Sequence, residues 1–320
     1  MTGERSAARA GSPATSKKAA TRKKGRLTKM VVTLITFGAI GLSPPHGGNG
    51  PGGPVTGPAT PVAAPSAAVS SGDQVKVHCL DVGQADCIYI QLPGNNDILI
   101  DGGDQDDGPA VVDYLKRQGL DGQIELLIAT HPHRDHMGGL PEVLEAFAVN
   151  EVLDSGLPAQ SAWYETVAQR VVAEGCWWVH DDRQVYEFGE VRLQILTGGR
   201  IWKEVNDHSV VARLDCGQVE FLFAGDMGKE AEEQLAGDIS AEILKVGHHG
   251  SGSSTSAGFL ARVQPETAVI SVGSGNRYGH PHPGILARLL GFGIRVHRTD
   301  WEGTIVIGTD GDKYWICQPE

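Results

Sequence analysis

The stretch at residues 130–139, THPHRDHMGG, decides the fold class of this chain. Its metal-binding side chains are those of His131, His133, Asp135 and His136. The stretch directly follows the apolar run 124–129, and a buried strand that ends in such a cluster delivers its ligands at a rigid sheet edge. Nitrogen and oxygen donors at this density suit zinc, with manganese and iron as alternatives. We therefore predict a metal site at the end of a strand.

The N-terminal part of the chain does not have the composition of a folded domain. Residues 1–29 carry nine Lys or Arg and one acid, and residues 30–42 form an apolar run. A basic segment before about 13 apolar residues is typical of a secretory signal, whereas a membrane span needs roughly 20; an uncleaved anchor is the alternative. In both cases the basic flank predicts that the rest of the chain lies outside the cytoplasm. Membrane contact is expected only through this segment, if it is uncleaved.

Residues 43–72 are rich in Pro, Gly and Ala and predict a flexible linker. Residues 73–320 are then long enough for one substantial domain. The whole chain has 27 basic and 39 acidic residues, of which residues 1–72 hold nine and one. The remaining 18 basic and 38 acidic residues give the domain a formal charge of −20. Such a domain repels nucleic acid unless a local basic groove exists.

Strands and helices are predicted in both halves of the domain. Strands are expected at residues 75–82, 85–92, 97–100, 124–130, 151–154, 209–214, 219–224, 243–246, 267–272 and 295–297. Helices are expected at residues 109–118, 141–147, 162–174, 255–263 and 284–290. This mixture predicts an α/β fold in which two packed sheets carry helices on the outside.

Several other polar residues have simpler interpretations. The acidic loop of Asp101, Asp104, Asp106 and Asp107 is predicted to be solvated. The five cysteines have no CxxC spacing, so a bridge between Cys79 and Cys87 and a pair of buried thiols both remain open.

Side chains with metal-binding chemistry recur after apolar strands along the whole domain. They are Asp81, the cluster 131–136, His208, Asp226 and the pair 248–249. With its His-x-His-x-Asp-His motif, the chain resembles the metallo-β-lactamase superfamily over nearly all of residues 75–320. The resemblance implies an αββα sandwich with two packed mixed sheets and helices outside. It also implies an enzyme that holds two divalent metal ions, zinc in the first place and manganese or iron as alternatives.

The resemblance also implies a role for each of these residues. The first ion takes His131, His133 and His208, the second takes Asp135, His136 and His248, and Asp226 bridges the two. Asp81 is expected to tie the metal loop together through hydrogen bonds. The choice between the adjacent residues His248 and His249 is open, with the first favoured as the ligand and the second as a catalytic contact.

Within the superfamily, the hydrolase domain of ComEC-type competence proteins is the most similar group. The similarity is carried by residues 80–86 (LDVGQAD), 99–103 (LIDGG), 206–211 (NDHSVV), 244–251 (LKVGHHGS) and 276–282 (NRYGHPH). Ala85 departs from the usual glycine, and His208 stands where asparagine is common. The multi-span channel of the full-length competence proteins has no counterpart here, so DNA uptake itself is not implied.

The implied chemistry is hydrolysis by a bridging hydroxide on the two metal ions. Asp135 would orient that hydroxide, while His249, His280 and Asn276 would donate hydrogen bonds to the substrate. Arg277 and Lys245 would add positive charge. The leading hypothesis is an exported phosphodiesterase, with DNA as one candidate substrate. The alternatives are a hydrolase of a small phosphoester, lactone or lactam, and a non-catalytic surface-binding module. The sequence indicates no protein partner.

Overall fold

The computed structural model describes residues 74–157, 161–180, 183–197 and 200–317. All of them belong to one compact unit, Val62–Glu320. The predictions for residues 1–29, 30–42 and 43–72 lie outside the described residues. Within the described ranges, no helix combines the length and the apolar character needed to cross a membrane.

Two sheets form the centre of this unit. The strands of the first sheet are β1 (Val75–Cys79), β2 (Ile88–Leu92), β3 (Asn96–Ile100), β4 (Gln123–Ala129), β5 (Ala148–Asp154), β6 (Trp177–His180), β14 (Ile305–Thr309) and β15 (Tyr314–Cys317). Those of the second are β7 (Val185–Phe188), β8 (Val191–Ile195), β9 (Ala212–Asp215), β10 (Glu220–Phe223), β11 (Ile243–Lys245), β12 (Thr267–Ile270) and β13 (Arg295–Arg298). The strand orders are β15-β14-β1-β2-β3-β4-β5-β6 and β13-β12-β11-β10-β9-β8-β7. Both sheets mix parallel and antiparallel pairs.

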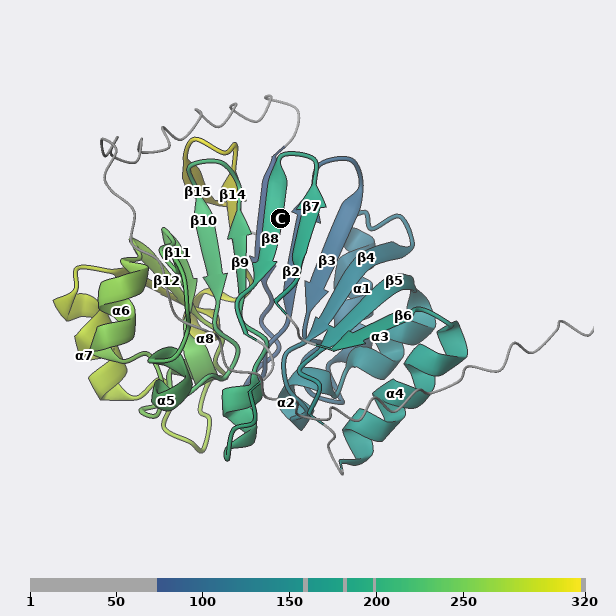
Figure 1. Ribbon diagram of the computed structural model, residues 1–320, viewed down its shortest axis with the longest axis horizontal. Coiled ribbons are helices and arrows are strands. Elements are labelled where there is room, and N and C mark those ends of the chain that lie inside the picture. The colour runs from purple at the N-terminus through teal and green to yellow at the C-terminus, as the bar shows by residue number, and fades with distance from the viewer. Residues whose placement is uncertain (1–73, 158–160, 181–182, 198–199, 318–320) are drawn as a thin grey trace, which may run out of the picture. The chain divides into compact units, whose positions relative to one another are not determined.

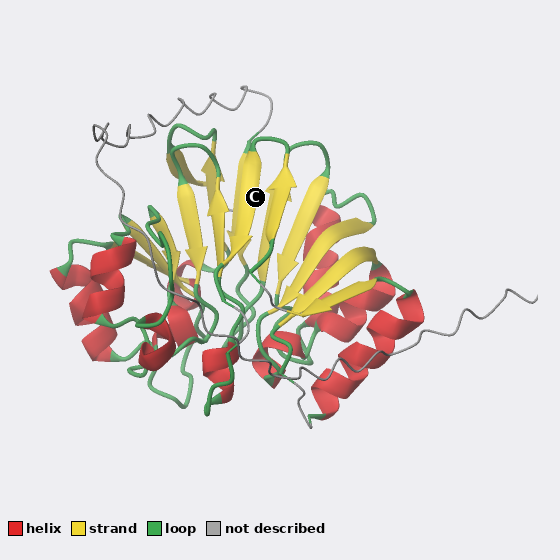
Figure 2. Cartoon of the chain, viewed as in Figure 1, coloured by secondary structure: helices red, strands yellow, loops and turns green. Residues whose placement is uncertain are grey.

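The longer helices lie on the outer sides of the two sheets (Figure 2). The helices are α1 (Gly108–Arg117), α2 (Arg134–Met137), α3 (Leu140–Ala146), α4 (Ala162–Glu174), α5 (Lys229–Glu232), α6 (Ala257–Val263), α7 (Pro283–Gly291) and α8 (Thr299–Glu302), with 3-10 turns η1 (Val205–His208) and η2 (Gly247–Gly250). Helices α1, α3 and α4 accompany the first sheet, and α5, α6 and α7 the second (Figure 1). The predicted αββα sandwich is confirmed.

Strand β4 shows how the apolar runs of the sequence fill the layers. Leu126 and Ile128 belong to the core between the two sheets, and Leu127 and Ala129 to the core under helices α1, α3 and α4. Successive side chains of a strand point to opposite faces, so β4 is buried on both sides. This is why the strand reads as a continuous apolar run that leads directly into the histidines.

The site is positioned by strands that end at the same edge of the sandwich. β3 and β4 are parallel neighbours in the first sheet, and β10 and β11 are parallel neighbours in the second. The residues that follow their carboxyl ends include Asp101, His131, Asp226 and His249. Parallel pairing brings these segments together although they are far apart in the sequence.

Most predicted elements are confirmed, with differences at their ends. Helix α4 has the predicted bounds because Ser161 accepts a hydrogen bond from the backbone N–H of Tyr164, and Gly175 ends the helix at φ 73°. The first strand is shorter than predicted, since β1 ends at Cys79 and residues 80–87 form no strand. The four-residue helices α2 and α5 had no sequence signal. All five cysteines are free thiols.

Candidate metal centre

Asp226 lies at the centre of a buried cluster of histidines. Its Oδ2 atom is 3.4 Å from Nε2 of His136, 3.6 Å from Nε2 of His248, 3.8 Å from Nε2 of His249 and 3.9 Å from Nε2 of His131. Asp226 follows β10 and is 2% exposed. Four imidazole nitrogens thus converge on one carboxylate from segments of both sheets.

Several buried atoms of this cluster have no hydrogen-bond partner. Among the described residues these include Asp86 Oδ1, His136 Nε2, Asp226 Oδ1 and His249 Nε2. An unsatisfied buried polar atom costs about 1–3 kcal/mol, so several around one point require an explanation. Divalent cations supply one, because ligand atoms of His131, His136 and Asp226, and of Asp135, His136 and His249, lie within 4.8 Å of one another. The residues present therefore fit a metal site.

The metal loop itself is held tightly against its neighbours. His133 precedes α2, and its Nδ1 lies 3.0 Å from Nε2 of His131. Gly139 has no room for a side chain, since a Cβ there would lie 2.2 Å from the carbonyl oxygen of Gly102. The two glycines after α2 are therefore required by the close approach of the loops after β3 and β4.

Charge in the cluster is divided unevenly between the histidines. Burial and the neighbouring His136 hold the pKa of His131 well below its usual value, so this imidazole is neutral. Burial opposes charge on His249, but the carboxylates of Asp226 and Asp86 outweigh it and raise its pKa to about 10. Burial opposes charge on Asp135 too, yet His249 and His136 lower its pKa to about 2. The carboxylates of the cluster therefore favour positive charge beside them, either on a protonated histidine or on a bound metal cation.

Asp101 is a functional residue that the sequence interpretation missed. It was predicted to be solvated, but it is 1% exposed. Its Oδ2 accepts a hydrogen bond from His136 Nδ1 at 2.7 Å, and its two oxygens accept from the backbone N–H and the hydroxyl of Thr130. This fixes the tautomer of His136 and directs Nε2 toward Asp226. Its position after β3, parallel to β4, was the available signal.

A second missed feature is the buried ion pair of Asp86 and Lys245. Each side chain is 2% exposed, and Lys245 Nζ donates to Asp86 Oδ2 at 2.8 Å. Asp86 Oδ1 lies 3.4 Å from Nδ1 of His249, and its backbone N–H donates to the carbonyl of Asp135. Lys245 was expected to add positive charge to the site, but its ammonium group is buried and paired with the Asp86 carboxylate. A lysine inside an apolar strand was the signal.

The structure buries His249 more deeply than His248, the residue that was favoured as the ligand. His249 is 2% exposed and lies among the converging donors, with Nε2 3.5 Å from Asp135 Oδ2. The side chain of His248 is 26% exposed and lies at the rim of the cluster, where it lines the cleft with Nε2 3.6 Å from Asp226 Oδ2. Both residues have left-handed backbone angles, φ 51° and 52°, which is costly for non-glycine residues and typical of functional turns. This turn directs the second imidazole inward.

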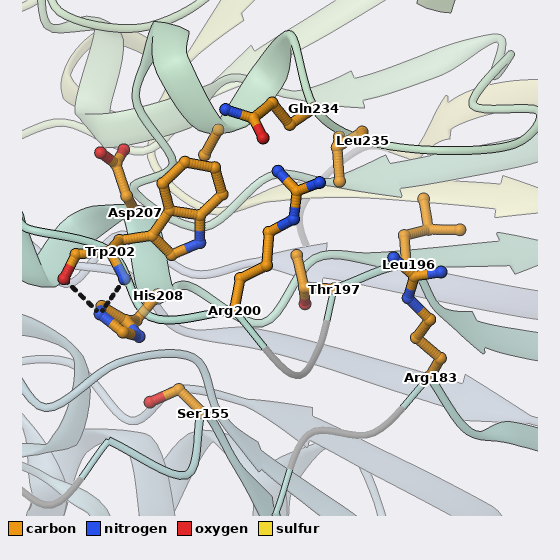
Figure 3. Close-up of a pocket in the computed structure, with 11 residues that line it drawn as sticks. Ser155, Arg183, Leu196, Thr197, Arg200, Trp202, Asp207, His208, Gln234 and Leu235 are labelled. Carbon is orange, nitrogen blue, oxygen red and sulfur yellow. Dashed lines mark hydrogen bonds between the residues drawn. The ribbon is translucent and has the colours of Figure 1, made fainter. Parts of the chain in front are cut away.

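His208 was predicted as the third ligand of the first ion, and the structure does not bring it there. Its Nε2 lies 3.0 Å from the backbone N and 3.1 Å from the carbonyl oxygen of Trp202, as Figure 3 shows. Turn η1 directs the side chain into a separate pocket of about 40 Å³, which has room for a few waters only. The next residue, Ser209, instead reaches the cluster, since its hydroxyl accepts from the Asp226 N–H.

The three predicted supporting residues also behave differently. Asp81 is exposed, and its side chain accepts a hydrogen bond from the N–H of Gly83 two residues along the chain, so Asp86 and Asp101 take the role expected of it. The amide of Asn276 is used within its own loop. His280 remains beside the site, because its ring lies 5.8 Å from that of His248.

An open cleft leads to the cluster. It has a volume of about 570 Å³ and is lined by His133, Asp226 and His248, by the cations of Lys203 and Lys229, and by the carboxylates of Glu204, Asp207 and Glu230. Ligand sites in proteins commonly have volumes of about 300–1,000 Å³. A small or flexible group therefore has direct access to the cluster.

The family model described as the Metallo-beta-lactamase superfamily matches residues 80–274, more than half of the chain. The chain belongs to this superfamily. The structure of the metallo-beta-lactamase fold protein YhfI from Bacillus subtilis agrees, with a TM-score of 0.51 at 12% identity over 77% of this chain and 100% of that one. The predicted hydrolase fold is thus confirmed. The cluster around Asp226 lies at the edge of the sandwich where β3, β4, β10 and β11 end.

Curated relatives refine the position within the superfamily. ComE operon protein 3 of Bacillus subtilis is 31% identical over 260 residues, which cover 72% of this chain and 32% of that protein. Recombination protein 2 of Haemophilus influenzae is 30% identical and covers 76% of this chain and 30% of its own length. The similarity to ComEC-type proteins is confirmed. The chain spans about a third of the length of these relatives.

Proposed function

We propose that this metallo-beta-lactamase superfamily member is a phosphodiesterase that uses two divalent cations. The convergence of unsatisfied donors on Asp226 carries the proposal. His131, His133 and Asp226 would hold one ion, and Asp135, His136 and His249 the other, with Asp226 shared. Zinc, manganese or iron suits these nitrogen and oxygen donors. When bound, two such cations lower the pKa of a water and neutralise charge on a phosphoryl oxygen.

The chain's own side chains supply orientation and proton handling. The Asp135 side chain is 35% exposed, and its low pKa keeps it ionised at neutral pH, so its carboxylate would accept a hydrogen bond from an attacking water. His248 lines the cleft and has Asn206 and Ser253 as neighbours, at 3.3 Å and 3.1 Å from its ring nitrogens. It is therefore placed to donate to a substrate oxygen.

A phosphodiester would be attracted to the cluster by the cations that it holds. The cleft itself is lined by Lys203 and Lys229 but also by the carboxylates of Glu204, Asp207 and Glu230, and the domain as a whole carries a formal charge of −20. Competence and recombination proteins among the relatives favour DNA or another nucleotide polymer as that substrate. The basic and apolar N-terminal segments support a location outside the cytoplasm.

Two alternatives make different predictions. A hydrolase of a small phosphoester, lactone or lactam would turn over such compounds without cleaving DNA. A surface-binding module would bind no stoichiometric metal, and the complete donor set around Asp226 disfavours it.

The test is a screen of the full chain, reconstituted with zinc or manganese, against DNA, RNA, bis(p-nitrophenyl) phosphate and lactones. Asp135→Ala is expected to lower phosphodiester turnover by about 10²- to 10⁴-fold. Asp113→Ala, on the exposed side of α1, is the matched control and is expected to keep full activity. Turnover of lactones alone, or equal activity of the Asp135→Ala variant, would contradict the proposal.

A further inference from the structure

The loop between β12 and α7 is a rigid turn built around Asn276. The Asn276 amide donates to the carbonyls of Gly273 at 2.9 Å and His280 at 2.6 Å. Its Oδ1 accepts from the backbone N–H of Tyr278 at 3.1 Å and of His280 at 3.0 Å. One side chain thus satisfies the backbone on both sides of the turn. The residues at its tip are held in place before any ligand arrives.

This turn presents an aromatic ring next to the cleft. Tyr278 is 57% exposed, and its ring is nearly parallel to that of His280, with centroids 5.7 Å apart and an angle of 25°. The His280 ring in turn lies 5.8 Å from that of His248, whose Nε2 is 3.6 Å from Asp226. Two ring-to-ring steps therefore connect an exposed tyrosine with the candidate metal centre.

Arg277 adds a second flat group to the same surface. Its guanidinium carbon lies 5.2 Å from the centre of the Tyr278 ring, and one of its nitrogens donates to the Tyr278 hydroxyl at 3.1 Å. Aromatic rings and guanidinium planes are the two kinds of side chain on which nucleobases stack. The positive charge of Arg277 also suits the phosphate that accompanies a base.

We propose that Tyr278 and Arg277 form a stacking platform for a nucleobase of the substrate, which directs the attached phosphodiester to the centre at Asp226. This inference rests on the proposed function and adds a substrate class, phosphodiesters of nucleosides, and the residues that select it. Stacking of a base on an aromatic side chain contributes about 1–3 kcal/mol and does not depend on a basic groove.

The platform accounts for a mismatch between the charge of the domain and its proposed substrate. With a formal charge of −20, the domain is a poor electrostatic partner for a long nucleic acid. Recognition of single bases beside the cleft needs no extended positive surface. Because a base in a duplex already stacks on its neighbours, the platform favours single-stranded ends over duplex interiors.

The test compares two esters with the same p-nitrophenol leaving group, thymidine 5′-(p-nitrophenyl phosphate) and methyl p-nitrophenyl phosphate. In the wild-type, metal-loaded full chain the nucleoside ester is expected to have the higher kcat/KM. Tyr278→Ala is expected to lower the ratio of the two kcat/KM values about 10-fold through KM, and Tyr278→Phe to keep it. Trp177→Ala is the control, since Trp177 is 77% exposed on the edge strand β6 and does not line the cleft.

A binding measurement gives a readout that needs no turnover. Fluorescence anisotropy with a labelled eight-residue oligothymidylate is expected to show about a 10-fold higher Kd for Tyr278→Ala than for the wild type or Trp177→Ala. If the wild type hydrolyses both esters and Tyr278→Ala leaves the ratio and the Kd unchanged, the platform is overturned while the proposed function stands. If the wild type hydrolyses neither ester, the proposed function fails and the platform with it.

Discussion

The buried pair of Asp86 and Lys245 is the contact whose disruption should reveal most about how the site is held. Asp86 belongs to the segment between β1 and β2 of the first sheet, and Lys245 ends β11 of the second. The Nζ of Lys245 has two acceptors, Asp86 Oδ2 at 2.8 Å and the carbonyl of Val246 at 3.1 Å. The pair therefore joins the two sheets directly beneath the metal centre.

Removal of one partner should be costly because the other charge remains buried. Both side chains are 2% exposed, and breaking such a pair typically costs about 3–5 kcal/mol. We expect this loss in the free energy of unfolding for Lys245→Met, a large part of the 5–15 kcal/mol of a typical domain. At about 2–4 °C per kcal/mol for a domain of this size, Tm should fall by about 6–20 °C.

The double variant Asp86→Asn/Lys245→Met leaves no unpaired charge and should recover much of the stability. We expect it to lie within about 1.5 kcal/mol of the wild type. With about 3 kcal/mol or more lost in each of the single variants Asp86→Asn and Lys245→Met, this corresponds to a coupling energy of about 4.5 kcal/mol or more. Urea denaturation of the chelator-treated full chain separates this effect from metal binding.

The surface pair of Arg170 and Glu145 is the matched control. It has a similar 2.9 Å contact, but its side chains are 42% and 67% exposed, so its double-mutant cycle should give a coupling energy of less than about 1 kcal/mol. Strictly additive losses at Asp86 and Lys245 would refute the reasoning.

Two further predictions concern a carboxyl pair and the support of a ligand. Burial and the hydrogen-bonded neighbour Glu242 raise the pKa of Glu220 from 4.5 to about 8. The folded-state pKa lies above the unfolded value, so the associated stability is complete below about pH 4.5 and is lost as the pH rises toward 8. Allowing for solvent screening, we expect a loss of about 1–2 kcal/mol between pH 5 and pH 8. Urea denaturation should show a flatter pH profile for Glu220→Gln, and an unchanged slope would contradict the assignment. Asp101→Asn removes the carboxylate behind His136 and should weaken zinc binding about 10- to 100-fold by isothermal titration calorimetry, whereas unaltered affinity would show that Asp101 does not support the ligand.

Predictions that depended on neighbouring residues agree better with the structure than predictions that depended on residues far apart in the sequence. The metal loop 131–136 is contiguous, so its pattern alone indicated the donors and their place after a strand. His208 was chosen from its spacing to Asp226 along the chain, and Asp81 from its match to an early aspartate of the superfamily. Turn η1 directs His208 toward Trp202, and the segment after β1 leaves Asp81 in solvent.

Sequence by itself determined an α/β fold of two packed sheets and the contiguous loop 131–136, because local periodicity and short spacings are properties of the chain itself. The superfamily and its αββα sandwich followed from the resemblance that this loop and the later motifs carry. Only the tertiary structure decided that His249 rather than His248 turns inward, that Asp101 fixes His136, and that Asp86 and Lys245 join the sheets. These choices depend on backbone direction at the strand ends and on which side chains lose contact with water. Backbone direction and burial are both determined when the two sheets pack, so neither can be predicted from a single segment of the sequence.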